Sequence, residues 1–149
     1  MKTLYTAFKG KNNTSYQLIS ALNSQALFIT NSFQGAKRDV LSVNEELYDS
    51  VFMFGIDKSL TDSIKIELSA AVEGDFLDTD FDIEKLTSLC DQSCINYSIN
   101  NSPAVSLCNT AYYYMLKKKR NTIFIHIPSI GRMNPDFMKL LTDLFANRK

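Results

Sequence analysis

Two residues of the types that catalyse acyl transfer lie in the C-terminal half of this sequence. The single histidine, His126, sits in an apolar run that reads Thr-Ile-Phe-Ile-His-Ile-Pro over residues 122–128. Cys108 stands where a helical pattern begins, in the segment Ser-Leu-Cys-Asn over residues 106–109. A thiol at a helix start and an imidazole at a strand end are the two parts of a cysteine nucleophile site. If the fold brings them together, the chain is expected to be a hydrolase, since it has no other obvious general base.

The position of Cys108 also predicts its reactivity. In the first turn of a helix, the dipole and the free backbone N–H groups favour a thiolate over a thiol. We therefore expect the pKa of Cys108 to fall from about 8.5 toward neutrality or below, and the same N–H groups are candidates to bind an oxyanion. The alternative is that Cys108 is a small buried apolar residue and His126 a hydrogen-bonded core histidine. Spacing alone favours this alternative.

Other groups of polar residues have simpler explanations. Cys90 and Cys94 are four residues apart, but a zinc site would need two more ligands, so packing is favoured. The basic run at 117–120 suits the C-terminal end of a helix, and the tyrosines at 112–114 suit packing. Glu67 is a carboxylate in an otherwise apolar strand pattern. It is a candidate to orient an imidazole, although an exposed strand face explains it equally well.

Composition indicates one folded domain over residues 1–149. The 16 basic and 16 acidic residues cancel, so no long-range field favours nucleic acid or an acidic membrane. Three cysteines, no secretory h-region at the first residues and no membrane-length apolar window predict a cytoplasmic protein with free thiols. We expect no cofactor, no metal, no nucleic-acid partner and no membrane partner, and a homo-oligomer is compatible with the sequence.

Apolar runs of strand length alternate with helical periodicity along the whole chain. Strands are expected over residues 4–8, 26–30, 51–54, 63–72, 95–99 and 123–127. Helices are expected from Thr14 or Ser15 to 22, over 38–47 and 82–91, around 107–115, and from the Asn134-Pro135 pair through 145. Their periodicity predicts inward-facing side chains that include Leu41 and Leu47 in the second helix and Leu140 and Leu141 in the last. The acidic stretch 73–82 is expected to be a turn. This alternation predicts an α/β fold, a three-layer α/β/α sandwich with a mostly parallel mixed sheet.

Three segments, taken in order, resemble the pyroglutamyl peptidase I (pyrrolidone carboxyl peptidase) family of cysteine peptidases. Residues 101–109, Asn-Ser-Pro-Ala-Val-Ser-Leu-Cys-Asn, resemble the nucleophile motif S-N-[ST]-A-G-x-[FY]-[LV]-C-N. Residues 124–128, Phe-Ile-His-Ile-Pro, resemble the histidine motif F-I-H-[VI]-P. Residues 63–70 resemble the segment I-x-[LI]-E-[RK]-x-A that supplies the acid. Weaker matches extend the resemblance to the N-terminal region.

This resemblance implies a catalytic triad. Cys108 would be the nucleophile, His126 the general base and acid, and Glu67 the residue that orients the imidazolium. The family removes an N-terminal pyroglutamyl residue from peptides through an acyl-enzyme, so a small peptide or amide is the implied substrate.

The resemblance is weakest in the loops that form the family's substrate pocket. The P-F-G segment after the first strand is reduced to residues 9–11, and residues 55–60 replace the glycine-rich loop. By the resemblance, Phe8 is one remaining aromatic wall of the pocket. Ala104, the other expected substrate-contact residue, replaces the glycine before the nucleophile, a change that would alter the backbone donors near the thiol. A second interpretation follows from these changes: a divergent homologue without peptidase activity, acting as a binding or assembly module.

Overall fold

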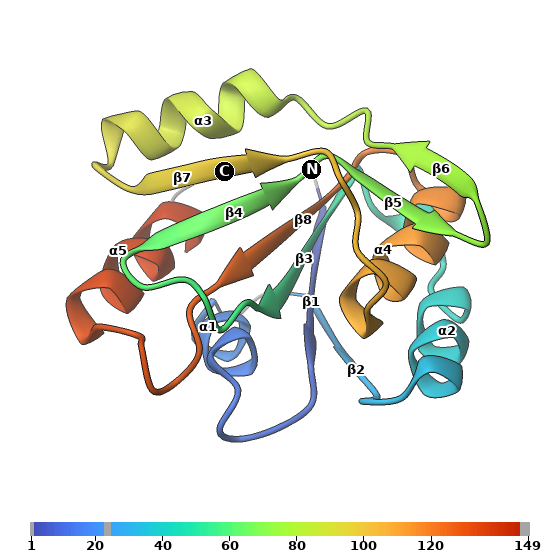
Figure 1. Ribbon diagram of the computed structural model, residues 1–149, viewed down its shortest axis with the longest axis horizontal. Helices are drawn as coiled ribbons and strands as arrows, with labels where there is room; N and C mark the ends of the chain where they lie inside the picture. Colours follow the sequence, from blue (N-terminus) through green and yellow to red (C-terminus); the bar gives the residue numbers. More distant parts are fainter. Residues whose placement is uncertain (1, 23–24, 147–149) are drawn as a thin grey trace.

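The computed structural model describes residues 2–22 and 25–146 and shows a six-stranded sheet flanked by helices (Figure 1). The strand order is β2-β1-β3-β8-β4-β7. These strands are β1 (Thr3–Phe8), β2 (Ala26–Ile29), β3 (Ser50–Ile56), β4 (Ser63–Glu67), β7 (Asn96–Asn100) and β8 (Thr122–Ile127). All neighbouring pairs are parallel except β4 and β8, which are antiparallel. The predicted mostly parallel mixed sheet is confirmed.

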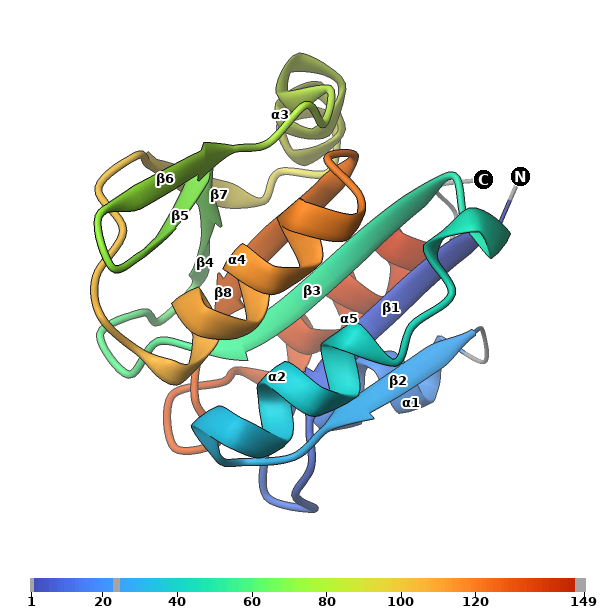
Figure 2. The same cartoon turned by 90° about the vertical axis from the view of Figure 1, so that its right-hand side faces the viewer.

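Helices cover both faces of the sheet, which gives three layers (Figure 2). The helices are α1 (Thr14–Ala21), α2 (Phe33–Leu41), α3 (Ile83–Gln92), α4 (Leu107–Lys118) and α5 (Pro135–Ala146). One apolar cluster joins α1, α3 and α5 to one face of the sheet. A second cluster joins α2 and α4 to the other face. Alternate residues of a strand point to opposite faces, so each central strand contributes to both clusters.

Two expectations about the second helix were wrong. The predicted helix 38–47 begins earlier and ends earlier, as α2, because Ser32 caps it by accepting a hydrogen bond from the Gly35 N–H at 3.0 Å. Leu41 and Leu47 were expected to point inward, but both are exposed. Leu47 lies in a separate 3-10 turn, η1 (Glu45–Leu47), so it does not continue the helical face.

The segment 63–82 also differs from the prediction. The expected single strand 63–72 divides into β4 and β5 (Ser69–Val72), and β5 belongs to a different sheet. Part of the expected turn 73–82 is β6 (Asp75–Asp78), which pairs antiparallel with β5. Glu73 and Gly74 form the connection in the left-handed region, with φ of 51° and 81°. The hairpin lies against α4, and β5 contacts the first turn of that helix (Figure 1).

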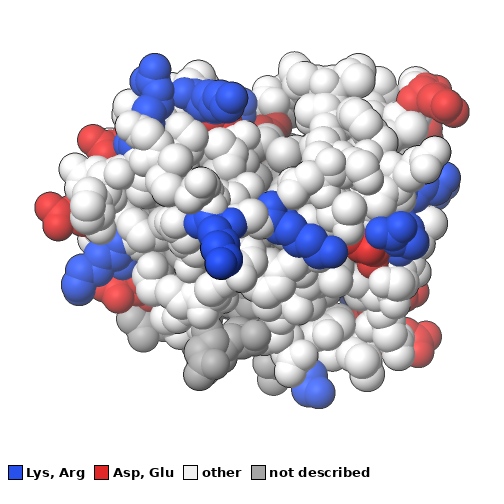
Figure 3. All heavy atoms as spheres, turned by 90° about the horizontal axis from the view of Figure 1, so that it is seen from below, with Lys and Arg blue, Asp and Glu red and all other residues white. Residues whose placement is uncertain are grey.

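None of the helices in the described part of the chain is both long and apolar enough to traverse a lipid bilayer. On the face drawn in Figure 3, basic and acidic side chains are interspersed over a largely uncharged surface. A single-sign patch therefore does not dominate that face.

Candidate active site

Glu67 and His126 form a hydrogen-bonded pair on the face of the sheet that α4 covers. Glu67 Oε2 lies 2.9 Å from His126 Nδ1. The antiparallel register of β4 and β8 places Glu67 opposite Phe124 and Lys65 opposite His126, so all four side chains share one face. Glu67 is only 7% exposed. A buried carboxylate on Nδ1 favours the tautomer that leaves Nε2 free to accept a proton.

Cys108 reaches this pair because a glycine lies beneath it. Gly55 of β3 is the register partner of His126 on the neighbouring strand β8. A Cβ added to Gly55 would lie 2.7 Å from the Cys108 sulfur, which is closer than side chains approach one another. The thiol therefore rests directly on the backbone of β3, beside the strand that carries the imidazole.

The helix start holds the thiol in place. Ser106 caps α4, and its hydroxyl accepts a hydrogen bond from the Asn109 N–H at 3.0 Å. The Asn109 side chain forms two hydrogen bonds with the backbone of Ala71 in β5, at 2.9 and 2.7 Å. The hairpin thus anchors the first turn of the helix, and Cys108 lies between the two anchored residues.

Cys108, His126 and Glu67 line one small cavity of about 80 Å³. Its other walls come from β4, β5, β7, β8, the segment before α4 and α4 itself, and include Lys65, Ser69, Asn100, Pro103, Ala104, Ser106, Asn109, Tyr112 and Phe124. The structure thus brings the predicted nucleophile, base and orienting acid to one place. It does not support the alternative in which the cysteine and histidine are unrelated core residues.

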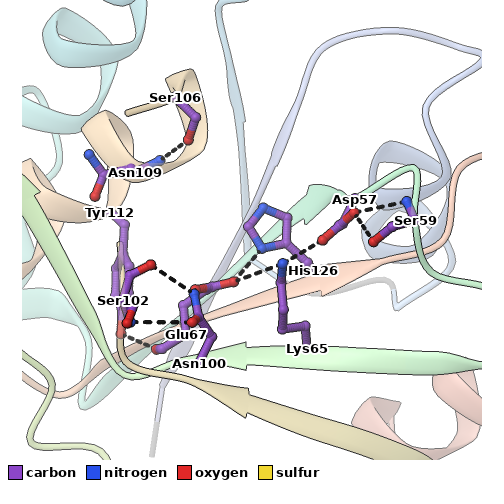
Figure 4. Close-up of polar contacts among 10 residues, drawn as sticks. All are labelled: Asp57, Ser59, Lys65, Glu67, Asn100, Ser102, Ser106, Asn109, Tyr112 and His126. Carbon is purple, nitrogen blue, oxygen red and sulfur yellow. Dashed lines mark hydrogen bonds and ion pairs between the residues drawn. The ribbon is translucent and has the colours of Figure 1, made fainter. Parts of the chain in front are cut away.

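Asn100 completes the hydrogen bonding of the Glu67 carboxylate. β7 pairs with β4 in a register that puts Asn100 beside Glu67, and the amide donates to Glu67 Oε1 at 2.6 Å. The same amide donates to the Ser102 carbonyl at 3.2 Å and accepts from the Ser102 N–H at 3.2 Å (Figure 4). Both carboxylate oxygens are therefore held, and the acid is tied to the segment that leads to α4.

Lys65 and Asp57 extend the polar network on the other side of Glu67. The Lys65 ammonium lies 2.5 Å from Asp57 Oδ2 and 3.9 Å from Glu67 Oε2. Asp57 follows β3, and its other oxygen accepts from the Ser59 N–H and hydroxyl. Burial would raise the pKa of Asp57, but these hydrogen bonds outweigh it and hold that pKa well below its usual range.

The expected lowering of the Cys108 pKa was wrong for this state of the protein. Burial, followed by the negative charge of Glu67, raises the pKa of the thiol to about 12. Hydrogen bonding to the sulfur from the Ile56 backbone opposes the shift but does not cancel it. A helix dipole contributes little where a thiolate must form in a largely buried position that faces a carboxylate. The thiol is therefore protonated near neutral pH.

Tyr112 joins the site to the core. It lies one turn after Cys108, its hydroxyl donates to the Glu67 carbonyl at 2.8 Å, and its ring lies 5.6 Å from that of Phe124. Burial raises the pKa of this phenol, so it remains a donor. The tyrosines at 112–114 were expected to pack, and Tyr112 does so while also fixing the strand that carries the acid.

The two predicted substrate-contact residues differ in placement. Ala104 lines the cavity. Phe8 is 4% exposed and belongs to the apolar cluster under α2 and α4, so it does not form a wall of this cavity. Sequence reasoning missed Lys65, Asn100 and Asp57. The alternation Ile-Lys-Ile-Glu was the available signal for Lys65, since it puts the lysine on the same face as Glu67.

The other cysteines lie elsewhere. Cys90 is buried in the apolar cluster on the opposite face of the sheet, whereas Cys94 is exposed. Within residues 2–22 and 25–146, no three His, Cys, Asp or Glu side chains are grouped so that they could hold a metal ion.

Comparison with known proteins gives a structural likeness only. No protein-family model and no curated protein match the sequence. The fold is similar to a mutant pyrrolidone carboxyl peptidase from Pyrococcus furiosus, with a TM-score of 0.80 and 20% identity over 99% of this chain and 97% of that one. It is also similar to pyrrolidone carboxyl peptidase from Thermus thermophilus, with a TM-score of 0.80 and 14% identity over 97% and 96% of the chains.

Pyroglutamyl peptidase I from Bacillus amyloliquefaciens gives a TM-score of 0.77 and 15% identity over 96% of this chain and 94% of its own. At these identities the likeness shows that the α/β fold is shared with pyroglutamyl peptidase structures. The activity must be argued from the site.

Proposed function

We propose that this chain is a cysteine amidase of the omega-peptidase type, which cleaves an N-terminally blocked peptide through an acyl-enzyme on Cys108. A pyroglutamyl residue or a similar blocked residue is the proposed acyl group. The observation that carries the proposal is the 2.9 Å Glu67–His126 hydrogen bond in a cavity that also contains the Cys108 thiol. Nucleophile, base and orienting acid are the parts that acyl transfer requires.

The first half of the reaction moves the thiol proton to His126. Because the thiol is stored protonated, His126 Nε2 takes the proton as the sulfur attacks the substrate carbonyl carbon. Glu67 stabilises the imidazolium through Nδ1. The backbone N–H groups of Leu107 and Cys108 at the start of α4 are proposed to bind the oxyanion, since the Asn109 N–H already donates to Ser106. His126 then gives the proton to the leaving amine as the C–N bond breaks.

Hydrolysis of the thioester completes the cycle. His126, neutral again, takes a proton from a water molecule that attacks the acyl carbon. The C–S bond breaks and the proton returns to the Cys108 sulfur. The blocked residue leaves as a free acid, and no cofactor is needed at any step.

A panel of fluorogenic amides tests this proposal. The wild-type protein is expected to hydrolyse a pyroglutamyl amide or another small blocked amide. Cys108→Ala should abolish turnover, whereas Cys94→Ala, which changes an exposed thiol outside the cavity, should leave it unchanged. Retained turnover in Cys108→Ala would place the chemistry elsewhere.

One observation favours a second function, a binding or assembly module. The thiol has a raised pKa in a cavity of about 80 Å³, which is small for a peptide substrate. In that case no amide in the panel is hydrolysed, and Cys108 resists alkylation near neutral pH both with and without the amides present.

A further inference from the structure

Lys65 is a cation inside the candidate site that the reaction described above does not use. It is the direct antiparallel partner of His126, and residues so paired have Cβ atoms about 5 Å apart on one face of the sheet. Its ammonium lies 3.9 Å from Glu67 Oε2, the same oxygen that bonds to His126 Nδ1. The side chain is 28% exposed, so solvent screens this contact only in part.

Asp57 fixes the ammonium in this position. The contact with Asp57 Oδ2 holds the Lys65 ammonium on this face of the sheet. Two hydrogen bonds from Ser59 fix the Asp57 side chain in turn. Figure 4 shows the resulting chain of polar contacts, from Asp57 through Lys65 to Glu67 and His126. It crosses from the end of β3 over β8 to β4.

We propose that Lys65 is a positioning residue that acts through Glu67: its ammonium weakens the attraction of that carboxylate for a proton on His126, and Asp57 limits the strength of this effect. Glu67 alone would favour the imidazolium, and a protonated imidazole cannot accept the thiol proton. The ammonium on the same carboxylate oxygen opposes that effect. The consequence for catalysis rests on the proposed function, but the effect on the protonation of His126 does not.

Few charged and titratable groups among the described residues surround His126. The direction in which each substitution shifts the titration of His126 therefore follows from its charge. Glu67 and Lys65 face it from β4, Asp57 from the segment after β3, and Cys108 and Tyr112 from α4. Lys65→Met removes the cation and leaves two carboxylates, so the pKa of His126 should rise. Asp57→Asn leaves the cation less neutralised, so the same pKa should fall.

The test is a pH titration of the ring C–H signals of His126 by NMR, which are unambiguous because the chain has one histidine. We expect Lys65→Met to raise the midpoint by about one pH unit and Asp57→Asn to lower it by a smaller amount. The double variant should return toward the wild type. Lys65→Arg, which keeps the charge, should titrate like the wild type.

The proposal predicts that the two single variants shift the His126 midpoint in opposite directions, and this distinguishes it from a purely structural role of Lys65. If Lys65 only held the site together, its loss would free His126 from Glu67 and lower the midpoint. A lowered or unchanged midpoint in Lys65→Met, or shifts of the same sign in both single variants, overturns the proposal. If Lys65→Met does not fold, as judged by circular dichroism, Lys65→Gln and the Asp57→Asn arm decide it.

The acid limb of the pH profile of kcat/KM gives a second readout. It should move with the NMR midpoint in each variant of an active enzyme. If no amide is hydrolysed by the wild type, the proposed function fails, while the titration still decides the role of Lys65.

Discussion

Cys108 shows how strongly the local environment decides the properties of a cysteine thiol. Its helix position favours the thiolate, but burial and the nearby Glu67 carboxylate favour the thiol, and the second influence is larger. In the proposed reaction, the cysteine therefore depends on His126 to remove its proton.

The raised pKa of Cys108 predicts how stability depends on alkaline pH. Above about pH 9 the unfolded chain loses this thiol proton, whereas the folded protein keeps it up to about pH 12. The contribution of the protonated Cys108 thiol to the free energy of unfolding is therefore complete below pH 9 and is lost as the pH rises toward 12. The free energy of unfolding falls there with a slope of up to about 1.4 kcal/mol per pH unit. Cys108→Ser should show a shallower decline between pH 9 and 11, measured by urea unfolding.

A matched comparison uses the exposed thiol. Cys94→Ser should follow the wild-type decline, because its side chain is exposed. Parallel curves for Cys108→Ser and the wild type would contradict the raised pKa.

At the level of elements, the site depends on the close approach of α4 to β3. Gly55 has no side chain, so the first turn of α4 can settle on the strand with the sulfur against the backbone. The N-cap at Ser106 and the Asn109 clip to β5 then fix how the helix begins. The antiparallel pairing of β4 with β8 brings the acid beside the base. Apart from the N-cap, each of these contacts joins elements that are distant in sequence.

Gly55→Ala should therefore disable the site. The new Cβ would meet the Cys108 sulfur and the Phe124 ring at 2.7 Å, so the thiol or the ring must move. We expect a loss of roughly 100-fold in kcat/KM, the typical effect of a misplacement near 1 Å, and about 1–3 kcal/mol of stability. Amide hydrolysis and urea unfolding measure the two effects.

Gly131→Ala is the control, because no atom lies within 4 Å of an added Cβ there. It should match the wild type in both measurements. Full activity in Gly55→Ala would mean that the thiol need not rest on β3.

At the scale of the whole molecule, the chemistry lies on one face of the sheet. The site belongs to the side covered by α2 and α4, and the apolar cluster with α1, α3 and α5 fills the other side. The sheet separates them, since strand residues alternate between the two faces. Substitutions in the cluster with α1, α3 and α5 should therefore change the stability of the protein without changing the properties of the site.

Two neighbouring leucines of α5 test this separation and correct an expectation. Both Leu140 and Leu141 were predicted to face inward, but Leu141 is fully buried and Leu140 is 40% exposed. Leu141→Ala should cost about 2–5 kcal/mol in urea unfolding because it leaves a cavity, whereas Leu140→Ala should cost less than about 1 kcal/mol. Below the unfolding transition, both variants should retain the wild-type NMR titration of His126. A shifted midpoint in folded Leu141→Ala would show that the two faces are coupled.

The sequence by itself determined which elements form and which residue types are available for chemistry. Apolar runs and helical periodicity are local signals, and they correctly predicted the strands that became β1, β3, β7 and β8, as well as α3 and α5. The pattern of β4 also put the polar residues Lys65 and Glu67 on one face. Local signals were less reliable for α2, where the Ser32 cap set the start, and for 63–82, where a change of sheet has no periodic signature.

Only the tertiary structure decided what the chemical residues do. The Glu67–His126 contact depends on the antiparallel register of β4 and β8, and the Asn100 contact on that of β7 and β4. Those registers join segments separated by about 30 to 60 residues, and no local pattern specifies them. The Cys108 pKa was predicted in the wrong direction for the same reason. A helix start has a local sequence signal, but burial and a facing carboxylate arise only when distant strands assemble around the cysteine.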